Sequence, residues 1–216
     1  GAYDETGRLL KLGCVRLTPK SLNLGGDGFV QELDPSTGAI TIRQGDFKAN
    51  LWFAGETLVY ESTAGKESPL EVAFGTWRDK TKDSILYDMM NRRDTFTGDQ
   101  VTASPSGFLW FHRNDDHPVD SAALARSQGV RPESLPEKHT EGRVFGGALC
   151  VDGGMTPPVE SEVRWQFWSG KAWTGVTPAR KQHLVSMRLE GEAGGEPQKW
   201  AAEAKSKKKK KTLQGA

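Results

Sequence analysis

The sequence lacks the motifs of several large enzyme classes and the long apolar runs of membrane proteins. It contains no GxSxG motif, no phosphate-binding P-loop and no GxGxxG motif at the start of a helix. No apolar run approaches the roughly 18 residues that span a bilayer, and the first residues do not have the pattern of a signal peptide. The sequence therefore predicts no membrane span and none of these enzyme classes.

Cysteine is also scarce. The two cysteines, Cys14 and Cys150, lie far apart in the sequence and form no CxxC motif. They are compatible with two free buried thiols or with one long-range disulfide, so the sequence leaves the redox compartment open.

A basic surface for nucleic acid is missing, although the formal net charge is +1. Six lysines, Lys205 and Lys207–Lys211, stand in a tail without acidic residues, and without them 23 basic residues face 28 acidic ones. The acidic body predicts no nucleic-acid partner. The lysine run is typical of a solvated tail, with non-specific binding to nucleic acid or anionic lipid as the alternative.

What the sequence does contain is a series of short β-strand patterns. They are separated by turn residues at intervals of roughly 8–12 residues, which is typical of a sandwich or barrel. The segments are 9–18, 29–33, 39–43, 47–53, 57–62, 70–77, 107–111, 143–152, 162–168 and 182–190. We therefore predict an all-β, antiparallel β-sandwich.

Turns and breaks in this pattern set the expected boundaries. Asp34–Gly38 and Gly55-Glu56 indicate two hairpins, and 83–93 and 119–128 are candidates for short helices. We expect one β-sandwich domain over 1–192, as a fragment that lacks its true N-terminus, followed by a polar, disordered tail over 193–216.

The strongest candidate for a functional site is the strand that runs from Gly107 into a polar stretch, His112 to His117. A rigid strand that ends in a polar loop is a common mounting for a binding site. The donors and acceptors here suit sugar hydroxyls, and an aromatic ring can stack on a sugar. The predicted substrate-binding residues are Trp110, His112, Arg113, Asn114 and Asp115. The alternative is a core strand with Trp110 inside, Arg113 paired with a carboxylate and a solvated loop.

Other chemistry is less well supported by the same stretch. The spacing of His112, Asp115, Asp116 and His117 matches no tight metal-binding template. Asp115 and Asp116 are adjacent in the sequence and would point to opposite sides of a strand, so they do not form a glycosidase pair. We predict no catalytic residue, no metal and no cofactor.

Tryptophan is frequent, and Trp165, Trp168 and Trp173 lie close together in the sequence. They could form an aromatic platform for a sugar. Core packing with one surface tryptophan is the interpretation that we favour.

Several stretches occur together in an order and spacing that resemble one family. They are Gly7–Arg16, Gln31–Asp34, Thr37–Ile40, Trp77-Arg78, Trp110–Asn114 and Phe145–Gly147. The chain resembles the N-terminal β-sandwich domain, of unknown function, of bacterial alpha-L-fucosidase-like proteins related to glycoside hydrolase family 95. The resemblance covers roughly residues 3 to 152, more weakly to about 190.

The resemblance implies a β-sandwich of the supersandwich type that packs on a catalytic (α/α)6 barrel and borders its sugar site. The catalytic carboxylates would come from the barrel, which this chain does not contain, and the parent protein would be periplasmic or secreted. The chain alone is then expected to be a non-catalytic module. The alternatives are a stand-alone carbohydrate-binding module and a structural domain without a ligand.

Overall fold

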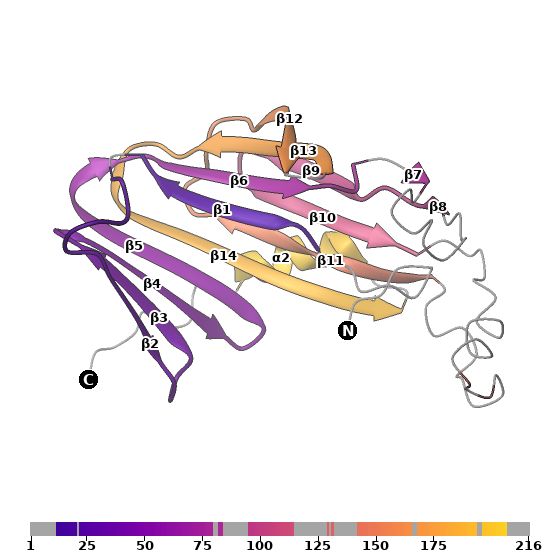
Figure 1. Ribbon diagram of the computed structural model, residues 1–216, viewed down its shortest axis with the longest axis horizontal. Coiled ribbons are helices and arrows are strands. Elements are labelled where there is room, and N and C mark those ends of the chain that lie inside the picture. Colours follow the sequence, from indigo (N-terminus) through magenta and orange to yellow (C-terminus); the bar gives the residue numbers. More distant parts are fainter. Residues whose placement is uncertain are drawn as a thin grey trace.

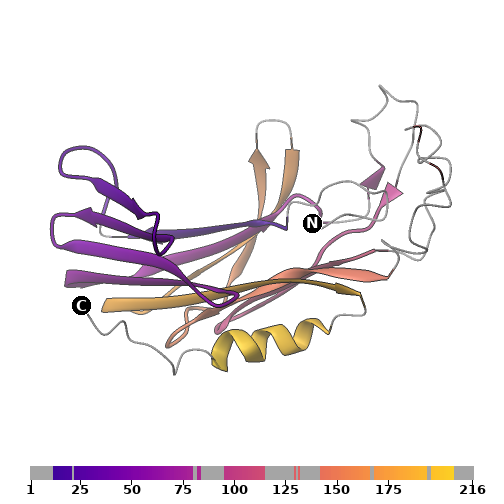
Figure 2. The same cartoon turned by 90° about the horizontal axis from the view of Figure 1, so that it is seen from below.

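The computed structural model describes residues 12–20, 22–79, 82–83, 95–114, 129, 131, 142–165, 168–193 and 196–206. Two antiparallel β-sheets face each other, and helix α2 lies on the outer side of the larger sheet (Figures 1 and 2). The predicted all-β sandwich is confirmed.

The larger sheet has eight strands in the order β2-β3-β4-β5-β14-β11-β10-β9. The strands are β2 (Val30–Asp34), β3 (Ala39–Gln44), β4 (Phe47–Ala54), β5 (Thr57–Ser68), β9 (Gln100–Ser104), β10 (Gly107–Arg113), β11 (Arg143–Val151) and β14 (Arg180–Ala193). All neighbours in this sheet are antiparallel, and its longest strand, β14, pairs with β5 on one side and β11 on the other.

The smaller sheet has four strands in the order β1-β6-β13-β12. They are β1 (Cys14–Pro19), β6 (Leu70–Thr76), β12 (Val159–Trp165) and β13 (Trp168–Val176). A separate two-stranded pair joins β7 (Lys82–Asp83) and β8 (Thr95–Phe96). The smaller sheet therefore faces only part of the larger one.

Aromatic side chains join the two sheets at the centre of the sandwich. Phe74 of β6 is fully buried and stacks on Trp110 of β10 at a centroid distance of 4.4 Å. Phe108 of β10 and Trp173 of β13 lie 6.1 Å and 6.3 Å from the same ring. Because each large aromatic side chain removes much apolar surface from water, this group forms the centre of the core.

A second apolar cluster lies on the outer face of the larger sheet, under α2 (Pro197–Ser206). Trp200 and Ala204 of the helix are buried against Val144, Ala148 and Cys150 of β11. The hydroxyl of Ser186 donates a hydrogen bond of 3.0 Å to the carbonyl of Ala204 near the helix end.

This helix corrects the prediction of a disordered tail for residues 197–206. Pro197 is favourable at the first helical position because its missing N–H is not needed there. Trp200, Ala201 and Ala204 share the face that meets the sheet, while Gln198 and Ala202 are exposed. The polar composition of the segment hid this narrow apolar face. Residues 207–216 lie outside the described residues.

The turn predictions have mixed outcomes. Both predicted hairpins are confirmed: Asp34 pairs with Ala39 across the first turn and Ala54 with Thr57 across the second, where Gly55 has a φ of 65°. The two helix candidates, 83–93 and 119–128, lie outside the described residues apart from Asp83, which belongs to β7.

Both cysteines are free thiols, so the disulfide alternative is wrong. Cys150 is buried under α2, where its thiol donates a 3.7 Å hydrogen bond to the carbonyl of Ala201, and Cys14 is exposed on β1.

The first hairpin turn predicts an acidic titration. Hydrogen bonds from the Ser36 and Thr37 side chains and from the Ser36 backbone lower the pKa of Asp34 from 3.8 to about 2. Since the folded value is the lower one, the ionised carboxylate favours the native turn above pH 3.8. That contribution disappears as the pH falls to about 2. NMR titration of the Asp34 carboxyl carbon should give the low midpoint, Ser36→Ala should raise it, and Ser36→Thr should keep it low. A wild-type midpoint near 3.8 would contradict this assignment.

The packing of α2 predicts a large loss of stability on truncation of its tryptophan. Trp200→Ala should lower the free energy of unfolding by about 3–5 kcal/mol, because it leaves a cavity between α2 and β11. Denaturant unfolding measures the loss. Gln198→Ala, on the exposed side of the helix, is the matched control and should change it by less than about 0.5 kcal/mol. Equal effects of the two substitutions would mean that the helix does not pack on the sheet.

Candidate functional site

The candidate site lies at the end of β10, where side chains alternate between the two faces of the larger sheet. Phe108, Trp110 and His112 point into the sandwich, and Leu109 and Phe111 point to the α2 side. This alternation is the normal geometry of a strand. It separates Arg113 from its neighbours His112 and Asn114, which the sequence analysis grouped as contacts to one sugar.

Trp110 is part of the core. Its side chain is 2% exposed and stacks on Phe74. Gly147 of β11 lies against the same ring, and a Cβ at that position would collide with it. The structure therefore shows the core alternative for Trp110, and the ring offers no free face to a sugar.

His112 belongs to a buried polar group that we call the Asp99 cluster: Thr76, Arg78, Asp99 and His112. The Nδ1 atom of His112 lies 3.2 Å from one carboxylate oxygen of Asp99. Arg78 donates two hydrogen bonds to the same carboxylate, from Nε at 2.8 Å and from Nη2 at 3.0 Å. The Thr76 hydroxyl donates a third, at 2.6 Å.

The Asp99 cluster connects three separate parts of the chain. Thr76 ends β6 in the smaller sheet, Asp99 precedes β9, and His112 lies in β10 of the larger sheet. The side chains of Asp99, Arg78 and His112 are 1%, 7% and 0% exposed. A buried charge is tolerated when it is paired and fully hydrogen-bonded, and the bidentate arginine supplies this for Asp99. The cluster therefore fixes the position of β10 at this end of the sandwich.

Arg113 and Asn114 have different surroundings. Arg113 is exposed, and its carbonyl accepts a 3.2 Å hydrogen bond from the Thr97 hydroxyl. Asn114 is 1% exposed, and its backbone N–H donates to the carbonyl of Arg143 at 2.9 Å. Asp115 lies outside the described residues, as do Asp116 and His117. Among the predicted residues that are described, Arg113 is the one whose side chain reaches solvent.

Arg78 and Asp99 were not predicted from the sequence as partners of His112. Arg78 appeared only within the Trp77-Arg78 motif of the resemblance, and no local pattern marked Asp99. The three partners of Asp99 lie elsewhere in the sequence: Thr76 in β6, Arg78 just after β6 and His112 in β10. Only the pairing of the strands brings them together.

Other candidate sites are limited within the described part of the chain. No group of three His, Cys, Asp or Glu side chains there could hold a metal ion. Trp173 is half-buried beside Phe74, whereas the side chains of Trp165 and Trp168 lie outside the described part. None of the helices described is long and apolar enough to cross a membrane.

Comparison with known families gives one match. The model of a family described as a domain of unknown function (DUF5703) matches residues 1–216. No curated protein matches the chain.

The Asp99 cluster predicts a strong effect of removing one charge. Asp99→Asn should lower the free energy of unfolding by about 3–5 kcal/mol, because Arg78 would remain buried without its counter-charge. The control is Glu32→Gln, which breaks the ion pair of two exposed side chains with Arg43 and should cost less than about 1 kcal/mol. Denaturant unfolding measures both, and a loss in Asp99→Asn as small as in the control would contradict the buried ion pair.

Proposed function

We propose that this chain, which belongs to the DUF5703 family of domains of unknown function, is a non-catalytic β-sandwich module of a carbohydrate-active protein. In this proposal the parent is a bacterial, alpha-L-fucosidase-like glycoside hydrolase. The module packs on a catalytic (α/α)6 barrel and borders the sugar site of that barrel. The same resemblance proposes a periplasmic or secreted parent.

The observation that carries the proposal is the exposed Arg113 next to the Asp99 cluster. The cluster holds β10 in place through buried hydrogen bonds, so the backbone that carries Arg113 is rigid. A guanidinium group has five donors for sugar hydroxyls and no acceptor of its own. A rigid arginine at the edge of a sandwich is suited to border a pocket that another domain completes.

The burial of the carboxylate and the imidazole favours a non-catalytic role. Asp99 and His112 have side chains that are 1% and 0% exposed. Asp99 is engaged by Arg78 and Thr76, which fill both of its oxygens. Neither group reaches a bond in a bulky glycan, so the proposal takes the catalytic carboxylates from the partner domain.

In this proposal the partner domain covers exposed apolar side chains of the module. Leu33, Phe53 and Val159 are 62%, 68% and 69% exposed. Covering such side chains is favourable because it removes their apolar surface from water. With Trp110 in the core, Arg113 also has no stacking face from that ring.

The proposal predicts that Arg113 affects sugar recognition in the full-length parent, while the isolated chain does not bind sugar. The isolated chain should show no saturable binding to a panel of fucosylated and plant cell-wall oligosaccharides. In the full-length parent, Arg113→Ala should raise KM by about ten- to a hundredfold, the range of a hydrogen bond to a charged group. Arg16→Ala, at an exposed position on β1 of the other sheet, is the matched control and should leave KM unchanged.

Two outcomes would overturn parts of this proposal. Saturable binding by the isolated chain, lost in Arg113→Ala, would make it a stand-alone carbohydrate-binding module. An unchanged KM in the parent with Arg113→Ala would leave a scaffold that does not border the sugar site. Cooperative unfolding of each variant shows whether it is folded.

A further inference from the structure

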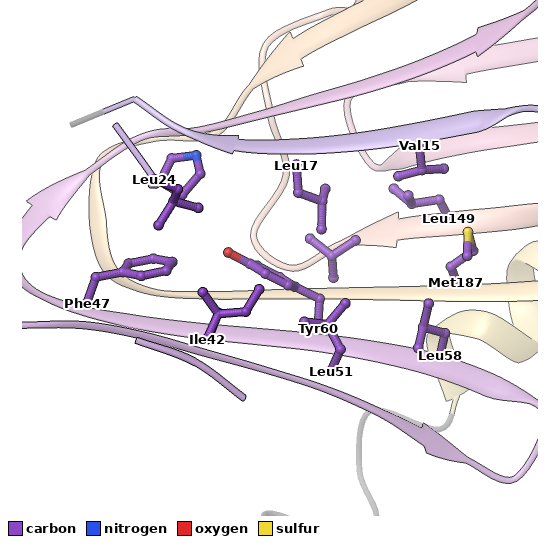
Figure 3. A pocket seen from close by; sticks show the side chains of 13 residues that line it. Val15, Leu17, Leu24, Ile42, Phe47, Leu51, Leu58, Tyr60, Leu149 and Met187 are labelled. Carbon is purple, nitrogen blue, oxygen red and sulfur yellow. The ribbon is translucent and has the colours of Figure 1, made fainter. Parts of the chain in front are cut away.

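A cavity of about 280 Å³ lies between the two sheets, beneath β1 and away from the Asp99 cluster. Alternate residues of β1, Val15, Leu17 and Pro19, form one wall (Figure 3). The opposite wall comes from five strands of the larger sheet, and Leu24 lies at one end. The remaining lining residues are Ile42, Phe47, Ala49, Leu51, Leu58, Tyr60, Leu149, Val185 and Met187.

The wall on the larger sheet is continuous because its residues are register neighbours. Leu51 pairs with Tyr60, and Tyr60 pairs with Val185. In the next row Leu58 pairs with Met187, which pairs with Leu149. Cross-strand neighbours have Cβ atoms about 4.5–5.5 Å apart, so the rows form an unbroken apolar surface.

The cavity is elongated along β1. The three β1 residues that line it span four residue steps, or about 13 Å at roughly 3.3 Å per step. The volume is near the lower end of ligand pockets, which measure roughly 300–1,000 Å³. Leu24 lines the cavity and is 37% exposed, so the cavity reaches solvent at this end. Such a slot suits a slender molecule.

The lining excludes polar ligands. Among the described residues every lining side chain is apolar except Tyr60, whose hydroxyl projects between the two walls (Figure 3). A sugar would leave its water hydrogen bonds and find at most one partner, which is unfavourable. The cavity is therefore distinct in its chemistry from the sugar edge proposed at Arg113.

Tyr60 supplies one hydrogen-bond donor to the cavity. Burial raises the pKa of its hydroxyl, and a hydrogen bond with the Ser62 side chain opposes this shift. A phenolic hydroxyl carries one O–H donor. Because the hydroxyl projects between the two walls of the cavity (Figure 3), it can donate to an acceptor inside it.

We propose that this cavity binds an unbranched alkyl chain that carries one neutral oxygen-containing group. The chain lies along β1 between Leu17 and the floor of Tyr60, Val185 and Leu51. The oxygen accepts the hydrogen bond of the Tyr60 hydroxyl. Fatty alcohols and neutral acyl esters have this chemistry, and none of the described residues that line the cavity is charged and could attract a fatty-acid carboxylate.

The first test is competition with a fluorescent apolar probe. N-phenyl-1-naphthylamine is bound to the full chain, and 1-octanol should displace it with a single saturable curve. Leu17→Trp fills the cavity and should weaken binding of both by more than about tenfold. Arg16→Trp adds the same ring to the adjacent residue of β1, on its other side, and should leave binding unchanged.

The outcomes separate this cavity from the exposed apolar surface. Failure of 1-octanol to displace the probe overturns the proposal. So does equal binding by Leu17→Trp and wild type, provided that Leu17→Trp unfolds cooperatively. Loss of probe binding in Phe53→Ser, with none in Leu17→Trp, would place the probe on the exposed side chain of β4 and also overturn it.

The second test isolates the hydrogen bond and adds no bulk to the cavity. Tyr60→Phe should weaken the binding of 1-octanol by about two- to tenfold, the range of one neutral hydrogen bond. It should leave the affinity for n-octane unchanged. An equal change in affinity for both ligands would show that the Tyr60 hydroxyl does not bind the oxygen of the ligand. Unchanged affinity for 1-octanol would do the same.

Discussion

The packing of Phe74 between the sheets is the interaction on which the rest of the structure depends. Its ring comes from the smaller sheet, contacts Trp173 beside it and stacks on Trp110 of the larger sheet. A Cβ at Gly13, which has a φ of 122°, would collide with the Phe74 ring. Because Trp110 must face Phe74, strand alternation turns His112 inward as well and leaves Arg113 outside. One aromatic contact thus determines which residues of β10 can meet a ligand.

The Asp99 cluster follows from the same constraint. Once His112 points into the sandwich, its imidazole needs a polar partner, and Asp99 provides one together with Arg78. A buried ion pair adds little net stability compared with apolar packing, yet the loss of one partner is costly. The cluster therefore acts against alternative positions of β10, since a shift by one residue would bury Arg113 and expose His112. The cluster therefore defines the register of β10 more strictly than the aromatic core does alone.

The sequence predicts what depends on local patterns. Asp34 and Gly38 mark a hairpin because turn geometry needs a side-chain acceptor and a positive φ, and Gly38 has a φ of 70°. The all-β class follows from the strand spacing. The Asp99 cluster could not be predicted, because its members meet only after the strands pair. Helix α2 was missed for another reason: its apolar face has only Trp200, Ala201 and Ala204 among polar residues, and sheet contacts decide whether it forms.

The unequal size of the two sheets links the apolar cavity to the exposed apolar surface. Inward positions on the larger sheet remain apolar beyond the part that the smaller sheet covers. Leu33 of β2 pairs with Ile40, which pairs with Leu51 at the cavity, and Phe53 of β4 pairs with Leu58. Leu33 and Phe53 are 62% and 68% exposed, although they continue these buried rows. Burial along each row therefore falls off at the edge of the small sheet, while the apolar character persists. A surface of this kind gains free energy when apolar material covers it, and on this ground we propose an apolar ligand for the cavity side of the sandwich and a polar one for the β10 end.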